Sequence, residues 1–302
     1  MSTYLADTAE SLTVEGPSAT FTYRRIGARG GLPLVLLNRV RGTLDTWDPQ
    51  FLEHLAAAHD VIVFDNVGTG YTTGTPPDSV AGLAEGAAEF IEALGLDRVD
   101  LLGWTLGGTA AQHLTLHRPD LVRRPVVAAA SPGGTVPGAP APNPKVGATM
   151  TKPEFIDDDL VFLFFPETDT GRTAGHAYLA RAATRLAAGL PDVSQAAAMG
   201  QTAALQKDAS IPFEQVRADL AAITQPVLYA TGMQDAMITP LAAYTAVQHL
   251  PNATLVAYSD AGHAFLFQHA EDFAAQVTAF LADETSRYVK QSLSAAPQPN
   301  AG

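Results

Sequence analysis

The chain of 302 residues carries 31 acidic and 18 basic side chains, for a net charge of −13, and 47% of it is hydrophobic. This length and composition suit one large globular domain with an insertion. The charge opposes nucleic acid and anionic membranes as partners, and the lack of cysteine excludes disulfides and thiolate metal sites. The acidic N-terminus lacks the apolar segment of a signal peptide, and no run reaches the ~18–20 apolar residues of a membrane span. We therefore expect a cytoplasmic protein whose partner is a small-molecule substrate.

Short apolar segments alternate with helical ones along most of the chain. We expect strands over residues 19–24, 33–37, 61–65, 99–102, 125–130, 226–230 and 253–258. The amphipathic or capped stretches predict helices over residues 47–58, 79–94, 107–117, 240–250 and 270–283. Strands that alternate with helices of this length are typical of a mostly parallel sheet covered by helices on both faces, an α/β fold.

The alternation stops in the middle of the chain. A Pro- and Gly-rich stretch over 131–144 marks a boundary, and Ala-rich helical segments follow to about residue 220. We therefore divide the chain into a first part of the core (1–144), a helical lid (145–220) and a second part of the core (221–285). The polar segment 286–302 is predicted to be a disordered tail.

The stretch from Val99 to Asp120 organises the chain. It consists of an apolar strand, the turn Gly-Trp-Thr-Leu-Gly-Gly over 103–108, and a helix that ends before Pro119. Strand, glycine-flanked turn and helix form the context of a nucleophile elbow, G-x-S-x-G, in which the central side chain stands clear of the sheet. Thr105 occupies the position of the usual serine. Because the elbow residue normally has a positive φ, a β-branched residue there is strained, which favours a working hydroxyl over a vestigial one.

Two further segments follow strands in the order that a hydrolase needs. Gly-Met-Gln-Asp over 232–235 ends with Asp235, and Ser-Asp-Ala-Gly-His over 259–263 ends with His263. With these segments and the elbow, the chain resembles α/β-hydrolase-fold proteins of the esterase, lactonase and non-haem peroxidase type from about Phe21 to Asp283. The resemblance implies a catalytic triad of Thr105, His263 and Asp235, in which the histidine removes the proton of the attacking hydroxyl. Asp260 is the alternative acid.

The oxyanion hole departs from the pattern of the family. Members usually carry His-Gly after the third strand, where this chain has Asn38 and Arg39. The N–H donors would come from the backbone of Val40 and Leu106, so side-chain identity does not decide their function. Arg39 or Arg41 is interpreted as an anchor for an acidic or carbonyl-bearing ligand, or else as a solvated surface residue. Asn38 would orient the loop or donate a hydrogen bond to substrate.

The apolar residues of the helical lid predict a binding pocket. Because the insertion leaves and re-enters the sheet at its carboxyl edge, it should arch over the site and enclose a pocket of ~300–1,000 Å³. We expect Phe162, Phe164 or Phe165 to contribute to its wall, with Tyr178 and Leu179 on the same apolar face of the lid. Trp104, beside Thr105, is interpreted either as a core residue or as a substrate contact. If the lid packs away from the site, its apolar face would form a homodimer contact instead.

Neither a metal nor a nucleotide cofactor is expected. The triple aspartate over 157–159 is interpreted as a solvated turn, and the Gly68-x-Gly70 pair has neither the spacing nor the acidic partner of a dinucleotide fingerprint. The first hypothesis is thus a cofactor-free hydrolase of a small to medium, mostly apolar ester or lactone. The second is a lyase, isomerase or cyclase acting on a specialised metabolite, with His263 as acid and base. A catalytically silent ligand-binding protein is the third.

Overall fold

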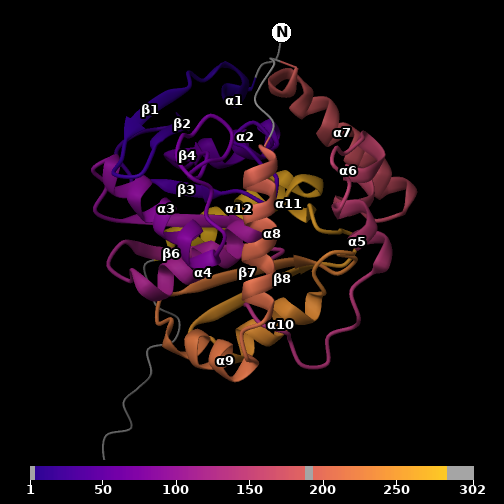
Figure 1. The fold of residues 1–302 in the computed structure, drawn as a ribbon. Helices are drawn as coiled ribbons and strands as arrows, with labels where there is room; N and C mark the ends of the chain where they lie inside the picture. Colours follow the sequence, from indigo (N-terminus) through magenta and orange to yellow (C-terminus); the bar gives the residue numbers. More distant parts are fainter. Residues whose placement is uncertain (1–3, 188–192, 284–302) are drawn as a thin grey trace, which may run out of the picture.

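A computed structural model describes residues 4–187 and 193–283. The described residues form one eight-stranded sheet in the order β1-β2-β4-β3-β5-β6-β7-β8, with helices around it (Figure 1). The first two strands run antiparallel to their neighbours, and the other pairs are parallel. The strands are β1 Leu12–Glu15, β2 Thr20–Ile26, β3 Leu34–Leu37, β4 Val61–Phe64, β5 Val99–Trp104, β6 Val122–Ala128, β7 Val227–Gly232 and β8 Ala253–Tyr258.

The helices connect these strands and form the insertion. In chain order they are α1 Leu5–Thr8, α2 Pro49–Ala56, α3 Val80–Ala93, α4 Leu106–His117, α5 Pro144–Met150, α6 Asp157–Phe164, α7 Asp169–Leu186, α8 Gln195–Ala209, α9 Phe213–Ala222, α10 Pro240–His249, α11 Phe265–Gln268 and α12 Ala270–Ala282. The architecture is the predicted α/β-hydrolase fold.

The central strands are buried on both faces of the sheet, because alternate side chains of each strand pack into two different hydrophobic clusters. In β3, Leu34 and Leu36 pack into the cluster that includes residues of α2 and α12, whereas Val35 and Leu37 pack into the cluster of α3 and α4. Residues of a strand point alternately to its two faces, so a continuous apolar run is required where helices cover both faces. The layered arrangement thus follows from the apolar runs of the sequence.

The strand order reverses beside β3, and this positions the site. From β3 the chain crosses through α2 to β4 on one side, and from β4 it crosses through α3 to β5 on the other. Ligands bind at such a switch point, beyond the carboxyl ends of the strands. The loop after Leu37 and the turn after Trp104 leave the sheet on either side of this point.

Most predicted elements are found, with corrections at their ends. Ser79 caps α3 as expected, since its side chain accepts a hydrogen bond from Gly82 N–H. The predicted helix over 47–58 begins only at Pro49, because Asp48 caps it and proline is well suited to the first helical position. Strand β1 was missed: its burial alternates only between half-buried and exposed, so its apolar pattern is weak. The tail predicted over 286–302 lies outside the described residues.

The insertion between β6 and β7 is helical, as predicted. Helices α5, α6 and α7 lie together at one side of the molecule, while α8 crosses beside α3 (Figure 1). Helix α9 packs against α10 and α4, and therefore against the sheet rather than over its edge. The division into lid and core at residue 220 remains a prediction. No described helix is both long and apolar enough to span a membrane.

Candidate active site

Thr105 lies at the tight turn between β5 and α4. Its backbone has φ 52° and ψ −116°, its N–H donates to Ala128 O at 2.9 Å, and the residue is 6% exposed. A positive φ is an outlier for a β-branched residue, because its side chain crowds the neighbouring carbonyl. The surrounding strand and helix therefore impose a strained conformation on the residue that the sequence placed at the elbow.

Gly107 allows the loop after β3 to lie directly on the start of α4. A Cβ atom at this position would come within 2.2 Å of Leu37 O and 2.6 Å of Asn38 O, both backbone atoms that cannot move away independently. Only glycine permits this approach. The loop that begins at Asn38 is thereby held beside Thr105.

His263 and Asp235 form a buried pair at the ends of β8 and β7. His263 Nδ1 lies 2.8 Å from Asp235 Oδ2, and both side chains are fully buried. The other carboxylate oxygen of Asp235 accepts hydrogen bonds from the N–H groups of Met237 and Ile238, at 2.8 and 2.9 Å. The carboxylate is thus fixed on one side by backbone and on the other by the imidazole, which leaves Nε2 as the nitrogen that faces away from it.

The alternative acid, Asp260, is engaged elsewhere. Its Oδ1 lies 2.9 Å from His269 Nε2, and this pair is partly exposed. Between the two candidate acids, the geometry therefore places only Asp235 behind His263.

The hydrogen bond that a triad would need between Thr105 and His263 is not formed. Among the described residues, His263 Nε2 is buried without a hydrogen-bond partner. Hydrogen bonds of this kind are often long or poorly aligned before substrate binds. The fold therefore pairs Asp235 with His263, while the hydroxyl of Thr105 forms no hydrogen bond with His263.

The loop over 38–42 is held by its own side chains and by the insertion. Asn38 Nδ2 donates to Thr43 O and Thr46 Oγ1, and Asn38 Oδ1 accepts from Arg39 N–H. Arg41 N–H donates to the side chain of Gln201 on α8. Asn38 therefore orients the loop, one of the two functions expected of it. The N–H of Val40 lies between the engaged N–H groups of Arg39 and Arg41 in the chain. Leu106 is the first residue of α4, so its N–H has no acceptor within the helix.

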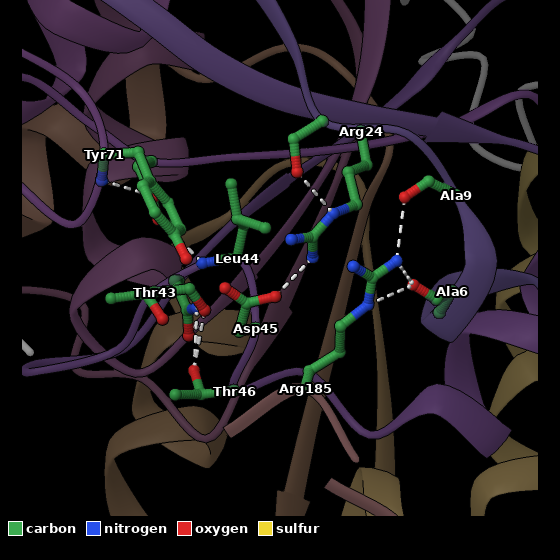
Figure 2. Close-up of polar contacts among 12 residues, drawn as sticks. Ala6, Ala9, Arg24, Thr43, Leu44, Asp45, Thr46, Tyr71 and Arg185 are labelled. Carbon is green, nitrogen blue, oxygen red and sulfur yellow. Dashed lines mark hydrogen bonds and ion pairs between the residues drawn. The ribbon is translucent and has the colours of Figure 1, made fainter. Parts of the chain in front are cut away.

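A charged network fixes the next part of this loop to the rest of the fold (Figure 2). Arg24 of β2 forms a buried ion pair with Asp45, and Arg185 of α7 donates to the carbonyl groups of Ala6 and Ala9. Leu44 N–H donates to the carboxylate of Asp65 at 2.7 Å. Burial raises the pKa of the Asp65 carboxyl to about 7, against the opposing effect of the hydrogen bonds from Tyr71 and Leu44.

Aromatic rings surround the imidazole. The ring centroids of Trp104 and Phe164 lie 5.7 and 5.9 Å from that of His263, and Trp104 Nε1 donates to His263 O at 3.0 Å. The guanidinium of Arg39 lies over the same two rings, 5.7 Å from Trp104 and 4.9 Å from Phe164. Arg39 is therefore not a solvated surface residue, which was one of the two interpretations of its position.

The predicted pocket is corrected in its size and in its lining. Of the three phenylalanines, Phe164 alone contacts His263: the ring of Phe165 lies against Tyr178, and that of Phe162 lies under the ammonium of Lys145. A cavity beside the elbow, lined by residues including Arg39, Leu106 and Gln201, has a volume of about 30 Å³. This cavity has room for a water molecule but not for an organic substrate.

The sequence patterns indicate neither Gln201 nor the polar contacts of Tyr178 in this region. The buried Tyr178 of α7 donates to Thr46 O at 2.8 Å, and its hydroxyl lies against the guanidinium of Arg39. Gln201 of α8 accepts the hydrogen bond from the oxyanion loop. Tyr178 was expected only as part of the apolar face of the lid, and Gln201 lies on an alanine-rich helix without a catalytic motif, so no local pattern of the sequence identifies it.

A metal site is not found in the part of the chain that the structure describes. None of its histidine and carboxylate side chains gather in a group that would hold a metal ion. Of the triple aspartate, Asp159 pairs with Lys152 at 2.6 Å and accepts from Ile156 N–H, at the start of α6. The three aspartates thus form the first turn of α6, where acidic side chains are favourable.

Comparisons with known proteins identify the family to which this fold belongs. A family model described as alpha/beta hydrolase fold matches residues 32–270. The chain is 31% identical over 293 residues to the polyketide synthase ThaQ of Burkholderia thailandensis, covering 93% of this chain but only 13% of that protein. It is 29% identical to a poly(3-hydroxyalkanoate) depolymerase of Ectopseudomonas oleovorans, with 89% of each chain covered. The solved structure of an alpha/beta hydrolase fold protein from Chitinophaga pinensis matches with a TM-score of 0.83 at 31% identity, covering 92% of this chain and 98% of that one.

Proposed function

We propose that this chain, which belongs to the alpha/beta hydrolase fold family, is an enzyme that hydrolyses a small to medium ester or lactone through an acyl-enzyme on Thr105. The observation that carries the proposal is the strained threonine at the start of α4. The buried His263–Asp235 pair lies on the loops that follow β8 and β7 of the same sheet. A relative whose name is pimeloyl-[acyl-carrier protein] methyl ester esterase, 32% identical over 185 residues, supports ester chemistry.

The reaction follows from the positions of these groups. His263 Nε2 takes the proton of the Thr105 hydroxyl as its oxygen attacks the ester carbonyl. The oxyanion accepts hydrogen bonds from Val40 and Leu106 N–H, and its collapse releases the alcohol, which takes the proton from His263. Water, deprotonated by the same imidazole, then attacks the acyl-threonine, releases the acid and restores the hydroxyl. Asp235 holds the imidazole and stabilises its cationic form.

The closed site adds one requirement. Because His263 is fully buried and Phe164 lies against it, the segment that carries Phe164 must move before an ester reaches Thr105. We therefore assign α6 the function of a lid. Opening of such a segment is a common slow step in enzymes whose closed form excludes water.

A fluorophosphonate probe tests the covalent mechanism. We expect the intact protein to gain one adduct, located on Thr105 by peptide mass spectrometry and abolished by His263→Ala. Thr105→Ser should hydrolyse short p-nitrophenyl esters faster than the parent, because it removes the methyl group that hinders attack and restricts the rotamer. Thr109→Ser is the matched control: this threonine lies one turn further along α4 and donates to Ser131 O. It should change neither rate nor labelling.

The second candidate function is acid–base chemistry without a covalent intermediate, by a lyase, isomerase or cyclase. It is favoured by the absence, among the described residues, of a hydrogen bond from Thr105 to His263 Nε2. In that case a folded protein stays unlabelled, and Thr105→Ser is no faster than the parent on esters. Labelling of Thr105 that depends on His263 excludes this candidate.

A further inference from the structure

Arg39 is a buried cation that no acidic side chain neutralises within residues 4–187 and 193–283. The residue is only 7% exposed, its Nη1 donates to the carbonyl of Val40 at 2.7 Å, and its Nε has no hydrogen-bond partner among the described residues. Its other neighbours are two aromatic rings and the hydroxyl of Tyr178, and the nearby guanidinium of Arg41 adds a second positive charge. Burial lowers the pKa of this guanidinium, which the Tyr178 hydroxyl opposes only in part.

Two other arginines of this fold have acidic partners. The buried Arg24 pairs with Asp45, and Arg181 of α7 pairs with Asp48 at 2.5 Å. Removing a charge from water is costly unless a counter-charge compensates it, so these two follow the usual rule. Arg39 departs from that rule at the candidate active site, where unfavourable charges are retained for function.

The cation shares its surroundings with the base. Trp104 and Phe164 contact both the guanidinium of Arg39 and the imidazole of His263. Two buried nitrogen atoms without partners, Arg39 Nε and His263 Nε2, therefore belong to one aromatic cluster. A planar guanidinium matches the two oxygens of a carboxylate, and such a pair is strongest in a buried, apolar setting.

We propose that Arg39 binds a carboxylate of the substrate, so that the enzyme selects an ester or lactone whose acyl chain also carries a free acid group. The assignment rests on the proposed hydrolysis for its reaction, but the binding of the carboxylate does not depend on Thr105. The aromatic rings would contact the apolar part of the acyl chain between the two ends. The specificity-determining residue thus occupies the place where relatives of this fold carry a small oxyanion-loop residue.

Two esters that differ in one group test the selectivity. Monomethyl glutarate carries a carboxylate where methyl valerate carries a methyl group. The parent should hydrolyse the glutarate ester with the higher kcat/KM, and Arg39→Met should lower that value by about 10- to 100-fold more than the value for methyl valerate, so that the preference is lost. Arg217→Met is the control, since it removes the same charge from an exposed face of α9 and should not alter the preference. Equal loss on both esters would overturn the proposal.

The binding of a dicarboxylate can be measured without any hydrolysis, so it tests this proposal independently of the proposed reaction. The chain has two tryptophans, and Trp104 lies beside Arg39, so its fluorescence should report a bound ligand. Succinate, glutarate and adipate should be titrated into the parent, Arg39→Lys and Arg39→Met. We expect saturable binding of at least one dicarboxylate to the parent, weaker binding to Arg39→Lys and none to Arg39→Met, even if no ester is hydrolysed. If no dicarboxylate binds the parent, or if Arg39→Met binds equally well, the proposal is wrong.

Thermal unfolding distinguishes a binding residue from a structural one. Because Arg39 is buried without a counter-charge, methionine of similar length should leave the melting temperature unchanged or raise it. A drop of several degrees in Arg39→Met would show that the guanidinium holds the fold together, and would overturn the assignment.

Discussion

His263 Nδ1 lies 2.8 Å from Asp235 Oδ2, although 28 residues separate them in the chain and both side chains are fully buried. The carboxylate also accepts two backbone hydrogen bonds, so it is rigid before any substrate arrives. This pair fixes which nitrogen of the imidazole is available as a base.

Asp235→Asn should lower kcat for ester hydrolysis by about 10²- to 10⁴-fold, because an amide favours the wrong tautomer of His263 and does not stabilise its cation. The melting temperature should change little. Asp260→Asn is a matched control, since Asp260 also pairs with a histidine, at 2.9 Å, but on the surface. Initial rates for both variants check this, and equal effects would contradict the assignment of the acid.

Thr105→Gly should stabilise the protein while abolishing hydrolysis. Glycine adopts a φ of 52° without strain, and relief of such strain contributes about 1 kcal/mol to the free energy of unfolding. Thr109→Gly, in regular helix on the same element, should instead destabilise by about 1–2 kcal/mol, since it loses the bond to Ser131 O. Urea denaturation measures both changes. A destabilised Thr105→Gly would mean that the elbow stores no strain.

Gly107→Ala should destabilise the protein by about 1–3 kcal/mol and reduce hydrolysis, because the new methyl group meets the carbonyls of Leu37 and Asn38 and pushes the oxyanion loop away from α4. Gly147→Ala, on the exposed face of α5, meets no atom within 4 Å. It should raise the free energy of unfolding by about 0.5–1 kcal/mol. Urea denaturation and ester assays on both variants separate steric effects from helix propensity.

Asp65 should make the protein less stable as the pH rises from about 4 to about 7. Burial raises its folded-state pKa to about 7, so in this range the native state holds a proton that the unfolded state has lost. The contribution is at most a few kcal/mol. Asp65→Asn should flatten the dependence of the unfolding free energy on pH, whatever its effect at a single pH.

Urea denaturation at several pH values between 4 and 8 measures that slope. The charged neighbours Asp45 and Arg24 also act on Asp65, so the slope need not vanish in the variant. Asp158→Asn, on an exposed position of α6, should leave the slope as it is in the parent. An unchanged slope in Asp65→Asn would show that this carboxyl is ionised throughout the range.

The sequence by itself determined the sheet, the elbow and the order of the candidate catalytic residues. These features depend on short-range patterns: apolar runs for buried strands, glycines around Thr105, and glycine before a strand-end histidine. Asp235 follows a strand where the family carries its acid, whereas Asp260 is close in sequence to His263 and poorly placed to stand behind it. In the structure, Asp235 pairs with His263 and Asp260 with His269.

Only the tertiary structure decided what surrounds the site. Arg39, Trp104, Phe164 and Tyr178 come from four different segments, and the sequence left open whether Arg39 was buried or solvated. The closed lid was not predicted either, since an apolar helix covers a pocket or fills it according to how closely it packs. Burial and charge compensation depend on contacts between distant segments, which local periodicity does not encode.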